Sequence, residues 1–327
     1  MIGALPMLIS DAVPVGFTDA VFESVSGLTT TGATILSGID ELPKSMLFYR
    51  QQLQWLGGMG VIVLAVAILP MLGIGGMQLY KAEIPGPMKE AKLTPRIAET
   101  AKALWYVYLA ITVACALAYW AAGMSLFDAI CHSFSTVSTG GFSTHDASMA
   151  YWDKAAIDWV GVIFMLIGGM NFALHFAAWR GRSLLTYVQD PEFRFFMGLM
   201  LMYIALVGIG LMFFHIHDHP DQAARHAAFQ VASFGTGTGL TSTNAAAWPG
   251  YIPYLLIFTS FIGGCAGSTA AGMKVVRAAL IARHSLRELR RLIYPNGIFA
   301  LRFGKHVVND RVLQAVWGFV GSTSPSR

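Results

Sequence analysis

Long apolar segments alternate with short amphiphilic ones along the 327 residues of this chain. An apolar helix of roughly 20 residues is long enough to cross the hydrocarbon core of a bilayer. Five segments have this length, and they lie at residues 52–73, 103–123, 156–178, 195–214 and 250–282. Hydrophobic residues make up 55% of the chain and charged residues 12%, against about 25% charged in ordinary soluble domains. The pattern predicts an all-α, polytopic membrane protein.

A second pattern occurs three times: a short amphiphilic segment ends in a turn rich in threonine, serine and glycine. The turns are Thr29-Thr30-Thr31-Gly32, Ser138-Thr139-Gly140-Gly141 and Thr236-Gly237-Thr238-Gly239. Each preceding segment is only about 12 residues long, so a re-entrant P-helix is expected, a form that membranes tolerate where it lines a protein cavity or water. The repeat is therefore span, P-helix, loop and span.

The glycines set the register of this repeat. Gly32, Gly140 and Gly239 are 108 and 99 residues apart. Units one and three align without a gap. If Gly140 is matched to the other two glycines, the segment before it in the second unit is one residue shorter than its counterparts.

The repeat divides the chain into four parts. Residues 1–80 are expected to form a first pore unit that lacks its leading span, and residues 81–180 a second unit. Residues 181–285 form a third unit with an intramembrane loop at 263–272. Residues 286–327 are interpreted as a cytoplasmic linker and the start of a truncated fourth unit, because the apolar run at 312–317 soon gives way to a polar one.

Charge is distributed unevenly between the two sides. The segments around the turns, 1–50, 124–158 and 215–249, carry four basic and eleven acidic residues, a net charge of −7. The other connections carry 17 basic and seven acidic residues, with Arg327 left unassigned. The positive-inside rule places the turns on the outer side and the basic loops in the cytoplasm. A negative outer face also concentrates cations.

The turns carry chemistry that suits a cation. A potassium ion that sheds its water needs oxygen ligands, which symmetric loops supply as backbone carbonyls. Glycine permits the positive φ that such loops require, and the C-terminal dipole ends of the P-helices favour a positive charge. The candidate filter residues are Thr30, Thr31, Gly32, Ser138, Thr139, Gly140, Gly237, Thr238 and Gly239. The alternative is that these small residues only allow helices to pack closely in lipid.

A glycine-rich run interrupts the last apolar segment. Its small residues have little helix propensity, which predicts an unwound segment in mid-membrane. Such a loop behind the filter could close the pore, and the candidate gate residues are Gly263, Gly264, Cys265, Ala266, Gly267, Ser268, Thr269 and Gly272. A helix-packing patch is the alternative.

Other polar residues have simpler interpretations. Asn171 and His175 are expected to form hydrogen bonds inside the bundle, and Glu23 to contribute to the field of the outer vestibule. The histidines at 215, 217 and 219 suit a solvated loop or a metal site. The three cysteines are interpreted as small hydrophobic residues.

Four stretches resemble the TrkH/KtrB family of bacterial potassium-translocating subunits. They are Ser26–Thr34, Gln54–Gly60, Phe134–Ser143 and Gly263–Thr269. The resemblance extends over nearly the whole chain. It implies four potassium-channel-like units around one pore, each with a filter glycine, and a gating loop in the third unit. No counterpart is found for the fourth filter or for the basic residue of the last span, and Gly237 replaces a threonine.

The resemblance also implies the setting of the protein. A multi-pass homodimer in the bacterial inner membrane would sit on a cytoplasmic, TrkA-like ring of nucleotide-binding regulatory subunits. Potassium is then the only ion bound by this chain, the nucleotide belongs to the partner, membrane lipids surround the spans, and no organic cofactor or nucleic acid is expected. The expected function is potassium uptake through a carbonyl filter.

Two other functions remain open from the residues. A cation-coupled secondary transporter, linked to protons or sodium, also uses broken helices, but it normally needs a titratable intramembrane pair. An intramembrane enzyme would need Ser268 paired with a histidine, and no spacing suggests such a pair. We therefore expect a protein that is not an enzyme.

Overall fold

A computed structural model describes residues 2–10, 15–63, 97–217, 219–294, 297, 301–304 and 306–308. The regular secondary structure of the described part is helical apart from one short hairpin. The longest helices are α3 (Lys44–Val63), α5 (Ile97–Ala121), α10 (Pro191–Phe213) and α13 (Val275–Ile293). Those of intermediate length are α2 (Phe17–Leu28), α6 (Leu126–Ser138), α7 (Ala155–Gly168), α8 (Phe172–Gly181), α11 (Pro220–Thr236) and α12 (Ile252–Ile262). The short elements are α1 (Leu5–Ile9), α9 (Leu185–Gln189), η1 (Ile2–Ala4), η2 (Ile39–Glu41), η5 (Ser148–Tyr151), η6 (Ala245–Ala247), β1 (Arg302–Phe303) and β2 (His306–Val307).

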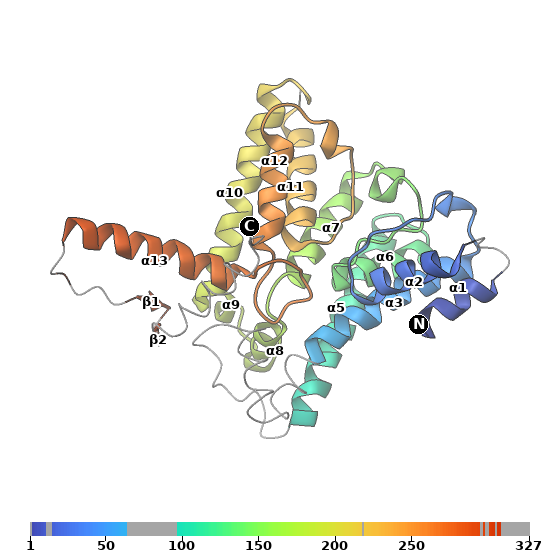
Figure 1. The fold of residues 1–327 in the computed structure, drawn as a ribbon, viewed down its shortest axis with the longest axis horizontal. Coiled ribbons are helices and arrows are strands. Elements are labelled where there is room, and N and C mark those ends of the chain that lie inside the picture. Colours follow the sequence, from blue (N-terminus) through green and yellow to red (C-terminus); the bar gives the residue numbers. More distant parts are fainter. Residues whose placement is uncertain are drawn as a thin grey trace.

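The helices assemble as three consecutive units. Helices α10, α11 and α12 stand side by side, α2 packs on α3, and α6 packs between α5 and α7 (Figure 1). Contacts of α3 with α6 and of α7 with α11 join each unit to the next. Helix α13 extends away from this assembly. Helices α2, α6 and α11 each lead into one of the three threonine-glycine turns, as the repeat predicts, although α11 has 17 residues and is longer than expected.

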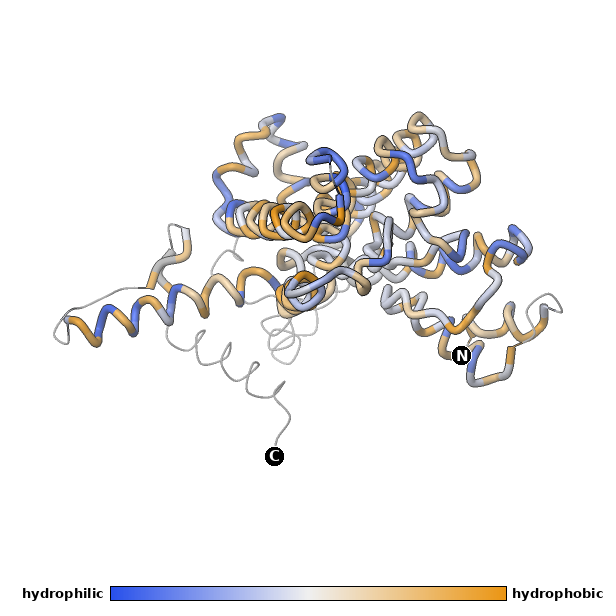
Figure 2. The backbone as a smooth tube through the Cα atoms, turned by 90° about the horizontal axis from the view of Figure 1, so that it is seen from above, coloured by the Kyte–Doolittle hydropathy of each residue, from blue (hydrophilic) through white to orange (hydrophobic). Residues whose placement is uncertain are grey.

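Membrane-spanning helices confirm the polytopic fold class. Residues Ala101–Ala121 of α5 and the whole of α10 are each long and apolar enough to cross a bilayer. Helices α7 and α8 together would form a third span, but they are bent by 95°. Bulky side chains such as Leu201, Phe213 and Phe258 are 60–74% exposed, which suits contact with lipid. Figure 2 shows that hydrophobic residues dominate much of the helical tube.

Two of the predicted apolar segments are broken, one of them unexpectedly. The segment 156–178 stops at Gly168 and restarts at Phe172, because Gly168-Gly169 favours helix weakly and Asn171 caps α8 by accepting a hydrogen bond from the Ala173 N–H at 2.8 Å. The segment 250–282 is non-helical between Ile262 and Val275, so the predicted unwound segment is present. Residues 64–96 and 309–327 lie outside the described residues, and the predicted unit boundary at residue 80 and the apolar run at 312–317 fall there.

The interior is apolar, with a few buried polar groups. One cluster of buried side chains joins the second unit to α11, a second lies mainly within the third unit, a third surrounds the start of α13, and a fourth joins α1, α2 and α3. Cys115, Cys131 and Cys265 are buried free thiols within the interior, as their apolar surroundings in the sequence indicate.

A buried ion pair ties the first P-helix to the next span. Arg50 of α3 contacts Glu23 of α2 at 2.6 Å, and both side chains are 1% exposed. Thr34, just after the first turn, donates its hydroxyl hydrogen bond to Glu23 at 2.9 Å. Glu23 is therefore a partner in a buried ion pair, a role that the sequence alone does not indicate.

Removing one member of this pair should destabilise the fold. Arg50→Met leaves a buried carboxylate without its partner, a change that typically costs about 3–5 kcal/mol, and we expect a clear fall in the melting temperature in detergent. Gln52→Met, at an exposed position of the same helix, is the matched control. Equal melting temperatures for Arg50→Met and the control would contradict a stabilising pair.

Candidate functional site

The three turns share one backbone conformation. In each turn, two residues spaced two apart have a positive φ. The first position is taken by Thr30, Thr139 and Gly237, with φ of 55°, 54° and 71°. The second is taken by Gly32, Gly141 and Gly239, with φ of 76°, 87° and 83°. Glycine adopts this conformation without steric cost, which explains why the second position is always glycine.

This geometry corrects the register predicted for the second unit. The residue between the two positive-φ positions donates its N–H to the carbonyl of the P-helix serine five residues earlier. The pairs are Thr31–Ser26 at 2.9 Å, Gly140–Ser135 at 2.8 Å and Thr238–Ser233 at 2.8 Å. Gly141, and not Gly140, is therefore the counterpart of Gly32 and Gly239, and the three units align without a gap. The doublet Gly140-Gly141 fits two registers in the sequence, and only the backbone distinguishes them.

The three turns lie against one another in chain order. A side chain at Gly32 would clash with the carbonyl oxygen of Gly140, and one at Gly141 would clash with the carbonyl oxygen of Thr238. At Gly239 the nearest atom in the described part of the chain would be the Gly141 Cα at 3.9 Å. The described loops thus form three neighbouring sectors of a ring, in chain order, with space beside the third glycine. We call them loops 1, 2 and 3 (residues 29–33, 138–142 and 236–240).

The loops bring carbonyl and hydroxyl oxygens together where three helices end. Helices α2, α6 and α11 end at these loops, so the negative ends of their dipoles lie next to the ring. Thr139 and Thr238 are at most 1% exposed. An arrangement of fixed oxygens without acidic side chains can replace the water around a weakly hydrated cation.

The glycine-rich segment, residues 263–272, lies directly behind loop 2, and we call it the intramembrane loop. The Thr269 hydroxyl lies 3.0 Å from the carbonyl oxygen of Val137, in the last turn of α6, and 3.1 Å from that of Gly168, at the end of α7. One side chain therefore links the intramembrane loop to the P-helix of loop 2 and to the broken span.

Further hydrogen bonds connect the intramembrane loop to the break between α7 and α8 and to the start of α10. Cys265 donates its N–H to the Gly169 carbonyl at 2.8 Å, and Gly267 accepts from the Phe172 N–H at 3.0 Å. The Ala266 N–H donates to the buried carboxylate of Glu192, at the start of α10, at 2.6 Å. The intramembrane loop thus packs against the break between α7 and α8.

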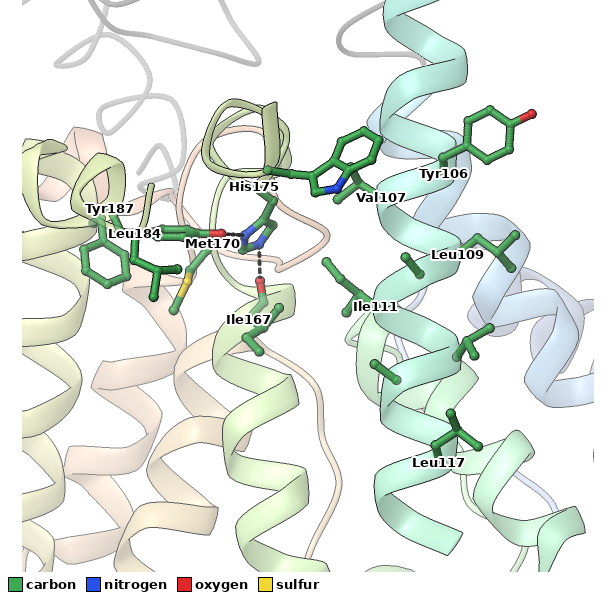
Figure 3. A pocket seen from close by; sticks show the side chains of 15 residues that line it. Tyr106, Val107, Leu109, Ile111, Leu117, Ile167, Met170, His175, Leu184 and Tyr187 are labelled. Atoms are coloured by element: carbon green, nitrogen blue, oxygen red, sulfur yellow. Dashed lines mark hydrogen bonds between the residues drawn. The ribbon is translucent and has the colours of Figure 1, made fainter. Parts of the chain in front are cut away.

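A large apolar cavity lies beside the break, between α5 and the segment from α7 to α10 (Figure 3). Its volume is about 1200 Å³. On its wall, His175 contacts the Ile167 carbonyl at 3.0 Å and the Tyr187 hydroxyl at 2.8 Å. These bonds confirm His175 as an internal hydrogen-bonding residue. The apolar wall offers few ligands to a cation, so the ring of loops is the candidate ion site.

Polar contacts also join the segments of units one and two that are expected on the outer side, here called the outer segments. Asp40 accepts hydrogen bonds from the His145 imidazole and, at 3.1 Å, from the Asp146 N–H. The hydrogen bond from His145 holds the pKa of the Asp40 carboxyl below its ordinary value of 3.8. In the outer segment of unit three, His217 stacks on His226 at 4.8 Å. Within the described residues, no three His, Cys, Asp or Glu side chains are grouped for a metal ion.

The comparisons with known proteins agree with this arrangement. A family model described as "Cation transport protein", TrkH, matches residues 1–322. The chain belongs to the TrkH family. It is 56% identical over 319 residues to the Trk system potassium uptake protein TrkH of Vibrio parahaemolyticus, covering 97% of this chain and 66% of the relative. Identity to TrkG of Escherichia coli K12, also named a Trk system potassium uptake protein, is 41% over 98% of this chain and 66% of the relative.

A solved structure shares the fold. The crystal structure of the potassium transporter TrkH from Vibrio parahaemolyticus matches with a TM-score of 0.87 and 52% identity, over 98% of this chain and 65% of that one. The chain therefore spans about two thirds of the length of these relatives.

The contact between Asp40 and His145 predicts a pH dependence of stability. A lowered carboxyl pKa stabilises the fold above pH 3.8, and this contribution is lost as the pH falls through the lowered value. His145→Ala removes the main cause of the shift, so the melting temperature should fall less steeply on acidification from about pH 5 to pH 3. His215→Asn, at an exposed histidine of another outer segment, should leave the slope unchanged. Parallel curves for His145→Ala and the unmodified protein would contradict the assignment.

Proposed function

We propose that this protein takes up potassium ions across the bacterial inner membrane, and that the ions pass through the ring formed by loops 1, 2 and 3. The observation that carries this proposal is the interlocking of three equivalent glycine turns at the ends of three P-helices. Their shared positive-φ geometry supports a common role, and the names of the relatives support potassium as the ion.

The chemistry of the ring favours selective permeation over proton coupling. Residues 29–33, 138–142 and 236–240 contain no titratable side chain, so a dehydrated ion would meet only dipolar oxygens. Glu23, the leading candidate for an intramembrane proton carrier, is paired with Arg50. A cation-coupled secondary transporter is therefore the weaker alternative.

The enzyme alternative is also weaker. The Ser268 hydroxyl donates to the Cys265 carbonyl at 2.6 Å within its own loop. A serine nucleophile instead needs a base within hydrogen-bond reach.

The intramembrane loop is proposed as the gate of this pathway. It lies behind loop 2, and Lys274, at its end, donates to the Ala270 carbonyl at 2.6 Å. A change in the position of α7, α8 or α10 would be transmitted to it through Gly169, Phe172 and Glu192.

We further propose a homodimer in the lipid bilayer on a cytoplasmic, TrkA-like, nucleotide-binding ring. The excess of basic residues on the expected cytoplasmic side supports an acidic partner surface there.

Altering the first filter glycine tests the function. Gly32→Ala places a Cβ against the Gly140 carbonyl and at an unfavourable φ, which costs about 1–3 kcal/mol. We expect the ratio of rubidium-86 to sodium-22 uptake into proteoliposomes to fall about tenfold or more. Gly198→Ala, in α10, where no atom of the described residues lies within 4 Å of the new Cβ, should leave the ratio unchanged. An unchanged ratio in Gly32→Ala would remove loop 1 from the filter.

Freeing the intramembrane loop tests the gate. Thr269→Val keeps the shape of the side chain but removes its hydrogen bonds to Val137 and Gly168, so the closed position should lose about 1–3 kcal/mol. We expect higher rubidium uptake in the absence of any regulatory partner. Thr259→Val, which removes only a bond within α12, is the control. Uptake equal to that of the control would contradict a gating role for this contact.

A further inference from the structure

Loops 1 and 3 restrain themselves internally in the same two ways. First, hydroxyl groups two residues apart bond to each other: Thr29 with Thr31 at 2.8 Å, and Thr236 with Thr238 at 2.7 Å. Second, the P-helix serine donates to the carbonyl seven residues later: Ser26 to Ala33 and Ser233 to Leu240, both at 2.6 Å. Each bond fixes the backbone on one side of the filter glycine.

Loop 2 has neither restraint. Gly140 takes the place of Thr31 and Thr238 and carries no hydroxyl. The equivalent serine, Ser135, is buried, and its Oγ has no hydrogen-bond partner among the described residues. Loop 2 nevertheless has the same positive-φ geometry as the other two, so another contact must hold it.

Gln54 of α3 supplies that contact from the first unit. Its Nε2 donates to the Gly140 carbonyl at 2.6 Å, and its Oε1 accepts from the Phe142 N–H at 3.1 Å. The side chain is fully buried. One turn earlier on the same helix, the Arg50 guanidinium lies 4.3 Å from the ring centre of Phe142. One face of α3 therefore contacts loop 2 through both Gln54 and Arg50.

The two bonds of Gln54 enclose the filter glycine. The Gly140 carbonyl belongs to the peptide group before Gly141, and the Phe142 N–H belongs to the peptide group after it. In a planar trans peptide the N–H and C=O point in opposite directions. Because Gln54 binds the Phe142 N–H, the Gly141 carbonyl is turned away from Gln54.

Gln54 also explains why residue 140 is glycine. A Cβ at Gly140 would lie 2.6 Å from Oε1 and 2.8 Å from Nε2 of Gln54. The φ of Gly140 is not among the positive values of this chain, so its backbone accepts a side chain, as threonine shows at the two equivalent positions. The Gln54 amide thus occupies the space that a threonine side chain fills in loops 1 and 3.

We propose that Gln54 is a positioning residue of the filter, which orients the Gly141 carbonyl and thereby sets the discrimination of potassium from sodium. Loop 2 is held by hydrogen bonds from a side chain of the neighbouring unit, whereas loops 1 and 3 are held by hydrogen bonds within their own units. The inference rests on the proposed function, because it assigns a determinant of selectivity to that same ring.

Exchanging the two kinds of restraint tests this assignment. Rubidium-86 and sodium-22 uptake are measured in proteoliposomes of the full-length protein carrying Gln54→Met, Gln54→Ala, Gly140→Thr or the pair Gln54→Ala with Gly140→Thr. Gln54→Met keeps the volume and loses both hydrogen bonds, whereas Gly140→Thr displaces the Gln54 amide. Each single variant should lower the rubidium-to-sodium ratio about tenfold.

The double variant should recover most of the ratio. Without the Gln54 amide, a threonine at 140 can bond to the Ser138 hydroxyl as Thr31 does to Thr29, so we expect a ratio within about threefold of the unmodified protein. Gln52→Ala, exposed on the same helix, should have no effect. The recovery also distinguishes a positioning role from loss of a structural contact. If Gln54 were only structural, the second substitution would lower the ratio further.

Two results would overturn the assignment while leaving the proposed function intact. One is a Gln54→Met variant that elutes as a single peak in size-exclusion chromatography and has the same rubidium-to-sodium ratio as the unmodified protein. The other is a double variant whose loss equals the product of the two single losses. Failure of the unmodified protein to take up rubidium would instead count against the proposed function itself.

Discussion

The close approach of each loop to the next is the constraint on which the rest of the site depends. Gly32 and Gly141 have no Cβ, and the carbonyl oxygen of the neighbouring loop occupies the space that a Cβ would need. The loops therefore support one another and hold their oxygens in place without acidic side chains. This suits an ion that must lose its water and regain it, because fixed dipoles bind such an ion moderately.

The surrounding helices serve this ring from two sides. Helix α3 joins units one and two: Arg50 pairs with Glu23 beside loop 1, and Gln54 holds loop 2. Behind the ring, Thr269 bonds both to the end of α6 and to the end of α7. The intramembrane loop is bonded to both sides of the 95° break between α7 and α8, so the three turn loops, the intramembrane loop and the break form one connected structure.

Much of this arrangement can be predicted from the sequence, because the three turns and the glycine-rich run carry strong local signals. The second register could not be predicted, since Gly140-Gly141 fits two alignments. The roles of Arg50 and Gln54 depend on which faces of α3 meet α2 and loop 2, tertiary contacts that an apolar helix does not encode in its periodicity. The break at Gly168 had a local signal, two glycines before a capping asparagine, which the overall apolarity of the segment obscured.

The central claim is that loops 1, 2 and 3 together bind the permeating ion. Anomalous diffraction from crystals of the full-length protein grown in rubidium tests it most directly. The account predicts a rubidium peak on the axis bounded by Gly32, Gly141 and Gly239, with ligands from the loop carbonyls. Ordered rubidium elsewhere in the membrane region, with none between these glycines, would contradict it.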